Sequence, residues 1–226
     1  MQSLWMLAAA FLFSLMAVCT KLGAEHFSTF ELVFYRSLFG MIVIALWVLL
    51  KRQTLRTQFF FSHMKRSFFG TLGLTIWFWT LGVLPLGTSM TLNYTSPLYM
   101  ALFVSVIALR AGRRPSLGLL AAIAAGFIGV VLALRPEVHA GEELAAAIGL
   151  SSGFFSALAY MQVKGLTKIG EPDWRIVFYF TLFGTVCGLL GQLVTAGGLN
   201  PIRTEDLPAL LGIGVTATLA QLCLTR

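Results

Sequence analysis

Charged residues are scarce in this sequence: Lys, Arg, Asp and Glu together make up 11% of the 226 residues, whereas hydrophobic residues make up 58%. The mean hydropathy is +0.85. Soluble domains carry charge on roughly a quarter of their residues, so this composition excludes an ordinary soluble protein and indicates a chain that lies in lipid. The formal net charge of +7 does not indicate a nucleic-acid partner, because the basic residues occur in short clusters between apolar segments.

Groups that could hold a metal or perform chemistry are also few. The three cysteines, Cys19, Cys187 and Cys223, fall inside apolar segments without the spacing of a metal site, and His63 and the other two histidines are expected in three separate loops. We therefore expect no metal ion and no cofactor. Apart from Glu31 at the outer end of the second segment, no Asp, Glu or His falls inside the segments expected to span the membrane, so the usual buried proton carrier is missing. Membrane-embedded catalytic motifs such as His-Glu-x-x-His are absent too, so we expect no enzyme and no catalytic residue.

Eight apolar segments approach the roughly 20 residues that a helix needs to cross the hydrocarbon layer of a bilayer. They are residues 4–22, 31–50, 67–84, 88–109, 116–134, 145–163, 175–196 and 207–224. The first segment has no basic stretch before it and no small-residue cleavage pattern, so we expect a retained span rather than a secretory signal. The predicted fold is an all-α polytopic membrane protein with about eight transmembrane helices.

The second half of the sequence repeats the first. The matching residues are Phe13-Ser14 with Phe155-Ser156, and Val33-Phe34-Tyr35 with Val177-Phe178-Tyr179. Five predicted spans, an odd number, separate the two starts, so the second copy enters the bilayer in the opposite direction. Such an inverted-topology repeat is typical of secondary transporters. We expect a first repeat of five helices at residues 4–135 and a second repeat of three helices at residues 143–226.

The loops between the predicted spans alternate in charge. The loops after the second, fourth and sixth spans are basic, with Lys51, Arg52, Arg56, Lys65, Arg66, Arg110, Arg113, Arg114, Lys164, Lys168 and Arg175. The other loops are acidic and nearly free of lysine. Because basic loops remain on the cytoplasmic side of a membrane, we expect both termini to face the cytoplasm.

Several short motifs resemble those of the EamA-type drug/metabolite transporter superfamily, and they extend over the whole chain. They are Phe34-Tyr35-Arg36, Asn93-Tyr94-Thr95-Ser96-Pro97, Gly126-Phe127-Ile128-Gly129-Val130 and Ala220-Gln221. The resemblance implies ten helices in two inverted five-helix repeats around a central cavity. It also implies a multi-pass protein of the bacterial inner membrane that moves a small metabolite by alternating access, with export as the expected direction.

Two features depart from that family pattern. Phe13-Ser14 stands where many members have Trp-Gly, so the substrate subgroup is not identified. The second copy ends after its third span, so we expect a chain truncated relative to ten helices. The alternative to a working permease is therefore a transport-inactive truncated fragment or a structural membrane protein.

The strongest local signal lies in the fourth span, at Asn93, Tyr94, Thr95, Ser96 and Pro97. Proline has no amide hydrogen and its ring crowds the carbonyl four residues earlier, so the helix should kink or open near the middle of the membrane. Irregular backbone at that depth is tolerated where it faces protein or a water-filled cavity. We therefore expect these five residues to bind substrate. The alternative is a packing kink whose hydroxyl groups satisfy freed carbonyls.

Arg36 is the one charge that the sequence places well inside a span, a few residues beyond Glu31. A charge at that depth is costly in lipid and usually functional, so Arg36 is expected to bind an anionic group of the substrate or to form part of a gate. Alternatively, its long side chain extends outward to Glu31 or Glu25 at the membrane surface.

Further candidates for substrate binding are Trp77 and Trp79 in the third span, Tyr160 and Gln162 in the sixth, and Gln221 in the eighth. Two residues apart on a helix means about 200° apart, so at most one of the two tryptophans can face a cavity comfortably. Core packing is the alternative for both. The last three are polar positions in spans that the family places at its cavity.

Small residues recur at four-residue spacing at Ala121, Ala125 and Gly129 and again at Gly184 and Gly188. Such patterns let helix backbones approach closely. We expect packing within the chain, with formation of a homodimer through the fifth span as the alternative.

The charges also narrow the substrate. No intramembrane carboxylate is available to pair with a cation, so a neutral, zwitterionic or anionic metabolite fits better than a cationic one. The expected partners are this small molecule and the lipid bilayer, with no nucleic acid.

Overall fold

A computed structural model describes residues 2–112 and 116–225, and every regular element in these two ranges is a helix. The helices are α1 (Gln2–Gly23), α2 (Thr29–Leu50), α3 (Phe60–Val83), α4 (Leu86–Asn93), α5 (Ser96–Arg110), α6 (Leu117–Leu134), α7 (Glu143–Lys168), α8 (Asp173–Ala196) and α9 (Leu207–Thr225). Arg113 and Arg114, which the sequence placed in a basic loop, lie outside the described residues.

The eight predicted spans correspond to these helices, with α4 and α5 together forming the fourth span. Within the described ranges, six segments are long and apolar enough to cross a membrane, and α6 adds a shorter apolar stretch at Leu117–Leu132. The all-helical polytopic membrane fold is therefore confirmed. The predicted limits of the third span are wrong, however, because α3 begins at Phe60 and includes His63 and Arg66, which the sequence assigned to the preceding loop.

The fourth span is interrupted where proline predicted an opening. Helix α4 ends at Asn93, and Pro97 lies in the first turn of α5. Tyr94 and Thr95 connect the two helices. A proline is tolerated in a first turn because the amide hydrogen it lacks would have no partner there. The prediction of a helix that opens at this point is confirmed.

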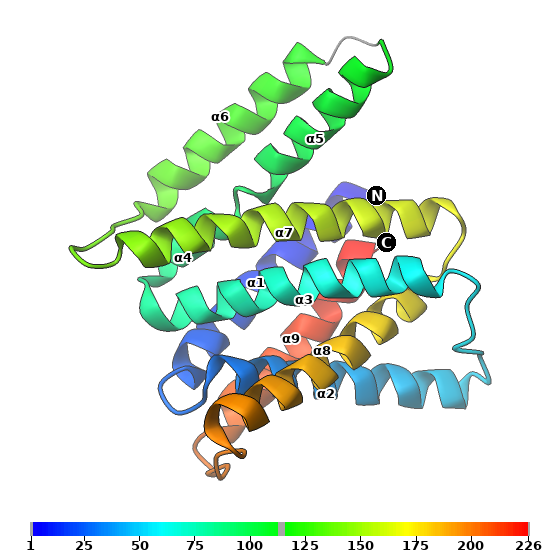
Figure 1. The fold of residues 1–226 in the computed structure, drawn as a ribbon, viewed down its shortest axis with the longest axis vertical. Coiled ribbons are helices and arrows are strands. Elements are labelled where there is room, and N and C mark those ends of the chain that lie inside the picture. Colours follow the sequence, from blue (N-terminus) through cyan, green and yellow to red (C-terminus); the bar gives the residue numbers. More distant parts are fainter. Residues whose placement is uncertain (1, 113–115, 226) are drawn as a thin grey trace.

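Pairs of helices from the two halves of the chain form the body of the molecule. The most extensive contacts are those of α3 with α7, of α1 with α9 and of α2 with α8. The connections after α2 and α7 lie on one side of this bundle, and the connections after α1, α3 and α8 lie towards the other (Figure 1). Each large helix contact therefore joins a helix that precedes residue 143 to one that follows it.

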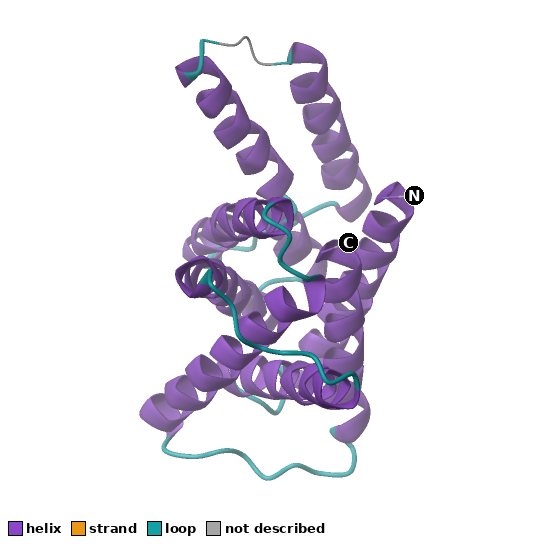
Figure 2. Ribbon diagram, turned by 90° about the vertical axis from the view of Figure 1, so that its right-hand side faces the viewer, coloured by secondary structure: helices purple, strands orange, loops and turns teal. Residues whose placement is uncertain are grey.

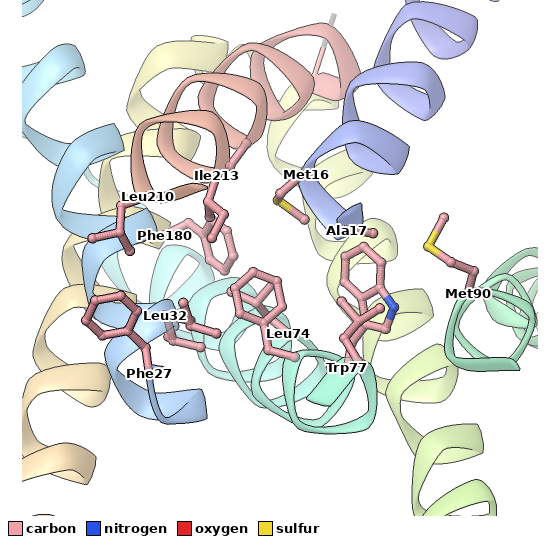
Figure 3. Close-up of a cluster of buried hydrophobic side chains, with 14 residues drawn as sticks. Met16, Ala17, Phe27, Leu32, Leu74, Trp77, Met90, Phe180, Leu210 and Ile213 are labelled. Carbon is pink, nitrogen blue, oxygen red and sulfur yellow. The ribbon is translucent and has the colours of Figure 1, made fainter. Parts of the chain in front are cut away.

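The buried apolar cluster at the centre draws on five of the long helices. It includes Met16 of α1, Leu32 of α2, Trp77 of α3, Phe180 of α8 and Ile213 of α9, whose side chains point towards one another (Figure 3). Interiors of this kind are closely packed, so the cluster fixes the positions of the helices around it.

The helix pair α5 and α6 stands away from the rest of the bundle in both ribbon views (Figures 1 and 2). Among the described residues, the larger contacts of this pair with other helices are those of α5 with α7 and of α6 with α4. A methyl group added at Gly126 or Gly129 of α6 would meet no atom within 4 Å. The close packing within the chain that we expected for the small residues of the fifth span is therefore not found.

The glycines of α8 do bring two backbones together, as their spacing predicted. A Cβ atom at Gly188 would lie 2.7 Å from the backbone nitrogen of Phe34, and one at Gly184 would lie 3.1 Å from Cβ of Ser37. Both contacts are with α2. Real Cβ atoms are not found so close to backbone atoms, so this helix crossing requires glycine at residue 188.

Candidate functional site

A cavity of about 80 Å³ lies between the helices of the two halves. At about 30 Å³ for each water molecule, it has room for roughly three. The side chains and glycine that line it are Phe13, Arg36, Arg66, Gly70, Leu74, Trp77, Asn93, Tyr94, Ser96, Ser156, Ala159, Tyr160, Phe180 and Gln221. They come from α1, α2, α3, α4, α5, α7, α8 and α9.

Helix α3 supplies one continuous wall of the cavity. Arg66, Gly70, Leu74 and Trp77 follow one another at spacings of four, four and three residues, so they share one face of the helix. Gly70 has a specific role there, because a Cβ atom at this position would overlap Nη1 of Arg66. The missing side chain leaves the space in which the guanidinium group lies.

The guanidinium groups of Arg36 and Arg66 meet at the ring of Phe180. Cζ of Arg66 lies 3.8 Å from the ring centroid and Cζ of Arg36 lies 5.1 Å from it, both within cation–π range. Arg36 is 3% exposed and Arg66 is 2% exposed. The structure thus places Arg36 inside the cavity and not at the outer surface beside Glu31, whose carboxylate accepts hydrogen bonds from Asn200.

Several buried polar atoms at this cavity have no hydrogen-bond partner within the described protein. They are Nε and Nη1 of Arg36, Nε and Nη1 of Arg66, Nε1 of Trp77 and Nε2 of Gln221. All six are N–H donors. An unpaired buried donor costs about 1–3 kcal/mol, and more when it carries charge, so acceptor atoms that reached these groups would stabilise the site. No Asp or Glu is among the described lining residues.

The interrupted span forms a polar wall of the cavity. Asn93 Nδ2 donates a hydrogen bond of 3.3 Å to Oγ of Ser152 on α7, and the hydroxyl group of Tyr94 lies 3.3 Å from Oγ of Ser14 on α1. These bonds tie the end of α4 to both α7 and α1. Ser96, the first residue of α5, completes this wall.

At one end of the bundle, the connection between α2 and α3 is bound to α8 and to the turn before it. Oγ1 of Thr57 donates to Oε1 of Glu171 at 2.7 Å, and Nη1 of Arg175 donates to Oε2 of the same carboxylate at 2.9 Å. Nη2 of Arg175 also donates to the carbonyl oxygen of Thr54 at 2.9 Å. We call this set, Thr54, Thr57, Glu171 and Arg175, the Glu171 clamp.

The carboxyl group of Glu171 is held ionised by the clamp. Burial raises its pKa, but the hydrogen bonds from Thr57 and Arg175, with the positive charge of Arg175, lower the pKa of Glu171 overall. Nε2 of the fully buried His63 lies 3.4 Å from Oε2 of Glu171, and the imidazole ring packs on the ring of Tyr179 with centroids 4.6 Å apart. His63 is one helical turn from Arg66, so the clamp adjoins the cavity.

A second clamp lies at the opposite end of α2. Ser28 and Glu31 form a capping box at the start of the helix, and Oε2 of Glu31 also accepts a bond of 2.9 Å from Nδ2 of Asn200, in the connection after α8. We call Ser28, Glu31 and Asn200 the Glu31 clamp. Both ends of the contact between α2 and α8 are therefore held by hydrogen bonds to a carboxylate.

Comparison with known proteins identifies the family of this chain. Residues 1–135 match the EamA-like transporter family. The chain belongs to that family. It is 30% identical over 229 residues to a riboflavin transporter of Vibrio cholerae, covering 99% of this chain and 74% of the relative. It is 28% identical over 218 residues to the pseudopaline exporter of Pseudomonas aeruginosa, covering 96% of this chain and 75% of the relative.

A solved crystal structure supports the fold assignment of this EamA-like chain. The two structures align with a TM-score of 0.76 at 18% sequence identity, over 99% of this chain and 77% of the other. Together with the apolar helices, these relatives show a multi-pass membrane protein of the drug/metabolite transporter superfamily.

The cavity of the EamA-like chain brings together seven of the residues proposed from the sequence: Arg36, Trp77, Asn93, Tyr94, Ser96, Tyr160 and Gln221. Thr95, Pro97, Trp79 and Gln162 do not line it. Oγ1 of Thr95 instead donates to the carbonyl oxygen of Leu92 at 2.6 Å, and Pro97 is exposed. Trp79 and Gln162 are half-buried elsewhere, so only one of the two α3 tryptophans faces the cavity.

Seven lining residues were not predicted from the sequence, namely Phe13, Arg66, Gly70, Leu74, Ser156, Ala159 and Phe180, and Arg66 is the charged one among them. Its neighbours His63 and Lys65 made residues 51–66 look like one basic loop. The signal that identifies it is helical spacing, because Arg66 is eleven residues before Trp77 and so lies on the same face of α3.

Proposed function

We propose that this EamA-like chain carries a small organic metabolite of neutral, zwitterionic or anionic charge across the membrane by alternating access. The observation that carries the proposal is the cavity itself, which is lined by α1, α2 and α3 from one half and by α7, α8 and α9 from the other. A site between two oppositely oriented copies can be opened to either side when the copies move relative to each other.

The lining of the cavity supports the charge assigned to the substrate. Arg36 and Arg66 would repel a cation, and no carboxylate among the described lining residues would attract one. The same lining offers aromatic surfaces and N–H donors, with no acidic or histidine side chain for proton transfer. These features suit a carrier rather than an enzyme.

Export is the proposed direction, with both termini in the cytoplasm. The basic loops support this orientation through the positive-inside rule. One of the relatives is named an exporter, which favours outward movement for this chain as well.

The proposal is tested by loading proteoliposomes that contain the full chain with a metabolite extract and measuring, by mass spectrometry, which compounds leave. A Ser156→Phe variant fills part of the cavity, and Ala121→Phe on the exposed surface of α6 adds the same ring elsewhere. We expect efflux of at least one non-cationic metabolite from the wild type and Ala121→Phe, and at least tenfold slower efflux per folded molecule from Ser156→Phe. Equal release from all three, or release of cations alone, would contradict the proposal.

A further inference from the structure

We infer that the cavity selects organic dianions: molecules with an apolar body and a total charge of −2, placed on carboxylate or phosphate groups. The inference deepens the proposed function and rests on it for the claim that the bound molecule is transported. Three features of the site support it, namely its charge, its hydrogen-bonding groups and its aromatic walls.

The buried charge of the site is positive and uncompensated. Arg36 and Arg66 share the ring of Phe180, and each is at least 97% buried. The nearby acids are occupied elsewhere, since Glu31 binds Asn200 and Glu171 binds Arg175. Two guanidinium groups that remain charged at neutral pH give the cavity a charge of +2. A ligand of charge −2 would neutralise it, whereas a monoanion would leave one buried cation unpaired.

The hydrogen-bonding groups also favour such a ligand. Arg36, Arg66, Trp77 and Gln221, which line the site, carry six buried N–H donor atoms that have no hydrogen-bond partner within the described protein. Ionised carboxylates and phosphates only accept hydrogen bonds, and they match the forked geometry of a guanidinium group. A ligand rich in hydroxyl or amino groups would leave many of these donors unpaired.

The other side chains that line the cavity favour an apolar carbon skeleton in the ligand. Phe13, Leu74, Trp77 and Phe180 provide apolar and aromatic surface beside the arginines. A compact apolar skeleton can pack against these side chains while its anionic groups reach the guanidinium groups. Inorganic anions would use the arginines but not this surface.

The inference is tested by isothermal titration calorimetry of the purified full chain at pH 7.5 with succinate, succinamate and succinamide. These three probes have nearly the same shape and carry charges of −2, −1 and 0. We expect succinate to bind at least tenfold more tightly than succinamate, and succinamide not to bind.

Methyl phosphate and sulfate serve as further probes. If methyl phosphate binds as tightly as succinate, the site accepts both negative charges on one group of the ligand. If methyl phosphate binds more weakly, the site is assigned to dicarboxylates. Tightest binding of sulfate would refute the role of an organic body.

Arginine variants give the decisive comparison. Arg66→Gln and Arg36→Gln each reduce the cavity charge to +1, so the preference for succinate over succinamate should fall at least fivefold in each. Arg66→Lys keeps the charge and should keep most of the preference, which separates charge from folding. Arg56→Gln, in the exposed connection after α2, is the matched control and should behave like the wild type.

The outcomes separate this inference from the proposed function. Equal affinity for succinate and succinamate in the wild type, or an unchanged preference in both glutamine variants, overturns the dianion site even if other metabolites are transported. Conversely, selective binding of dianions without any efflux from proteoliposomes supports the site and contradicts the transport function.

Discussion

Replacing Gly188 with alanine tests the contact between α2 and α8. The added methyl group would lie 2.7 Å from the backbone nitrogen and 2.9 Å from Cα of Phe34, so the helices must separate. Overpacking costs about 1–3 kcal/mol, and a clash with backbone that cannot rotate away favours the upper value of about 3 kcal/mol. Alanine recovers about 1 kcal/mol through its better helix propensity. The expected net loss of about 2 kcal/mol lowers the unfolding temperature by about 4–8 °C for a chain of this size.

Two other glycines provide graded controls for this measurement. A methyl group at Gly184 would meet mainly the side chain of Ser37, which can change rotamer, whereas one at Gly129 would meet nothing within 4 Å. Gly184→Ala should therefore lose less stability than Gly188→Ala, and Gly129→Ala should gain up to about 1 kcal/mol. Thermal unfolding of all variants would be followed by fluorescence in one detergent. The reasoning fails if Gly188→Ala unfolds within 1 °C of the wild type, or if Gly129→Ala loses as much stability.

Three further outcomes are expected. Reporters inserted in 51–59 and in 137–142 should lie on opposite sides of the membrane, the first in the cytoplasm, and labelling on the same side would contradict the inverted topology. A cysteine at Asn93 should react with water-soluble thiol reagents and one at Thr95 should react much more slowly, because only Asn93 lines the cavity; equal rates would argue against this arrangement. The lowered pKa of Glu171 means that its stabilising effect is present above the ordinary carboxyl pKa of about 4.3 and is lost as pH falls through the lower folded-state value. Glu171→Gln should therefore unfold with a weaker dependence on acidic pH than the wild type, and identical profiles would show that the clamp contributes nothing.

Most of the helical architecture could be predicted because hydrophobic length and helix breakers are local signals. The eight spans follow from apolar runs, the interruption near Tyr94 follows from the missing amide of Pro97, and the close approach of α8 to another helix follows from Gly184 and Gly188, although their spacing does not identify α2 as that helix. The site was harder to predict, since it depends on which faces of distant helices meet. Arg36 could be proposed because it is the one charge well inside its segment, with Glu31 at the outer end.

Arg66 shows why local signals were insufficient. It is preceded by polar and basic residues, and such sequences are usually solvated. Its burial depends on Gly70, which leaves space for the guanidinium group, and on Phe180, which lies more than 100 residues later in the chain. The small residues of α6 gave the converse error, because they predicted close packing within the chain that the structure does not show. A helix face that is able to pack closely need not meet a partner within the same chain.

The tight contact of α2 with α8 has a kinematic consequence. When one half of a molecule rotates against the other, atoms near the rotation axis move least and atoms far from it move most. At Gly188 the backbones of α2 and α8 touch, and the Glu31 and Glu171 clamps hold both ends of the pair. In the proposed alternating access, a rotation axis along this contact would leave the pair α2 and α8 and both clamps intact, and the large displacements would fall on the contacts of α3 with α7 and of α1 with α9. In that motion α2 and α8 would stay together at the axis while the other helices of the two halves moved apart.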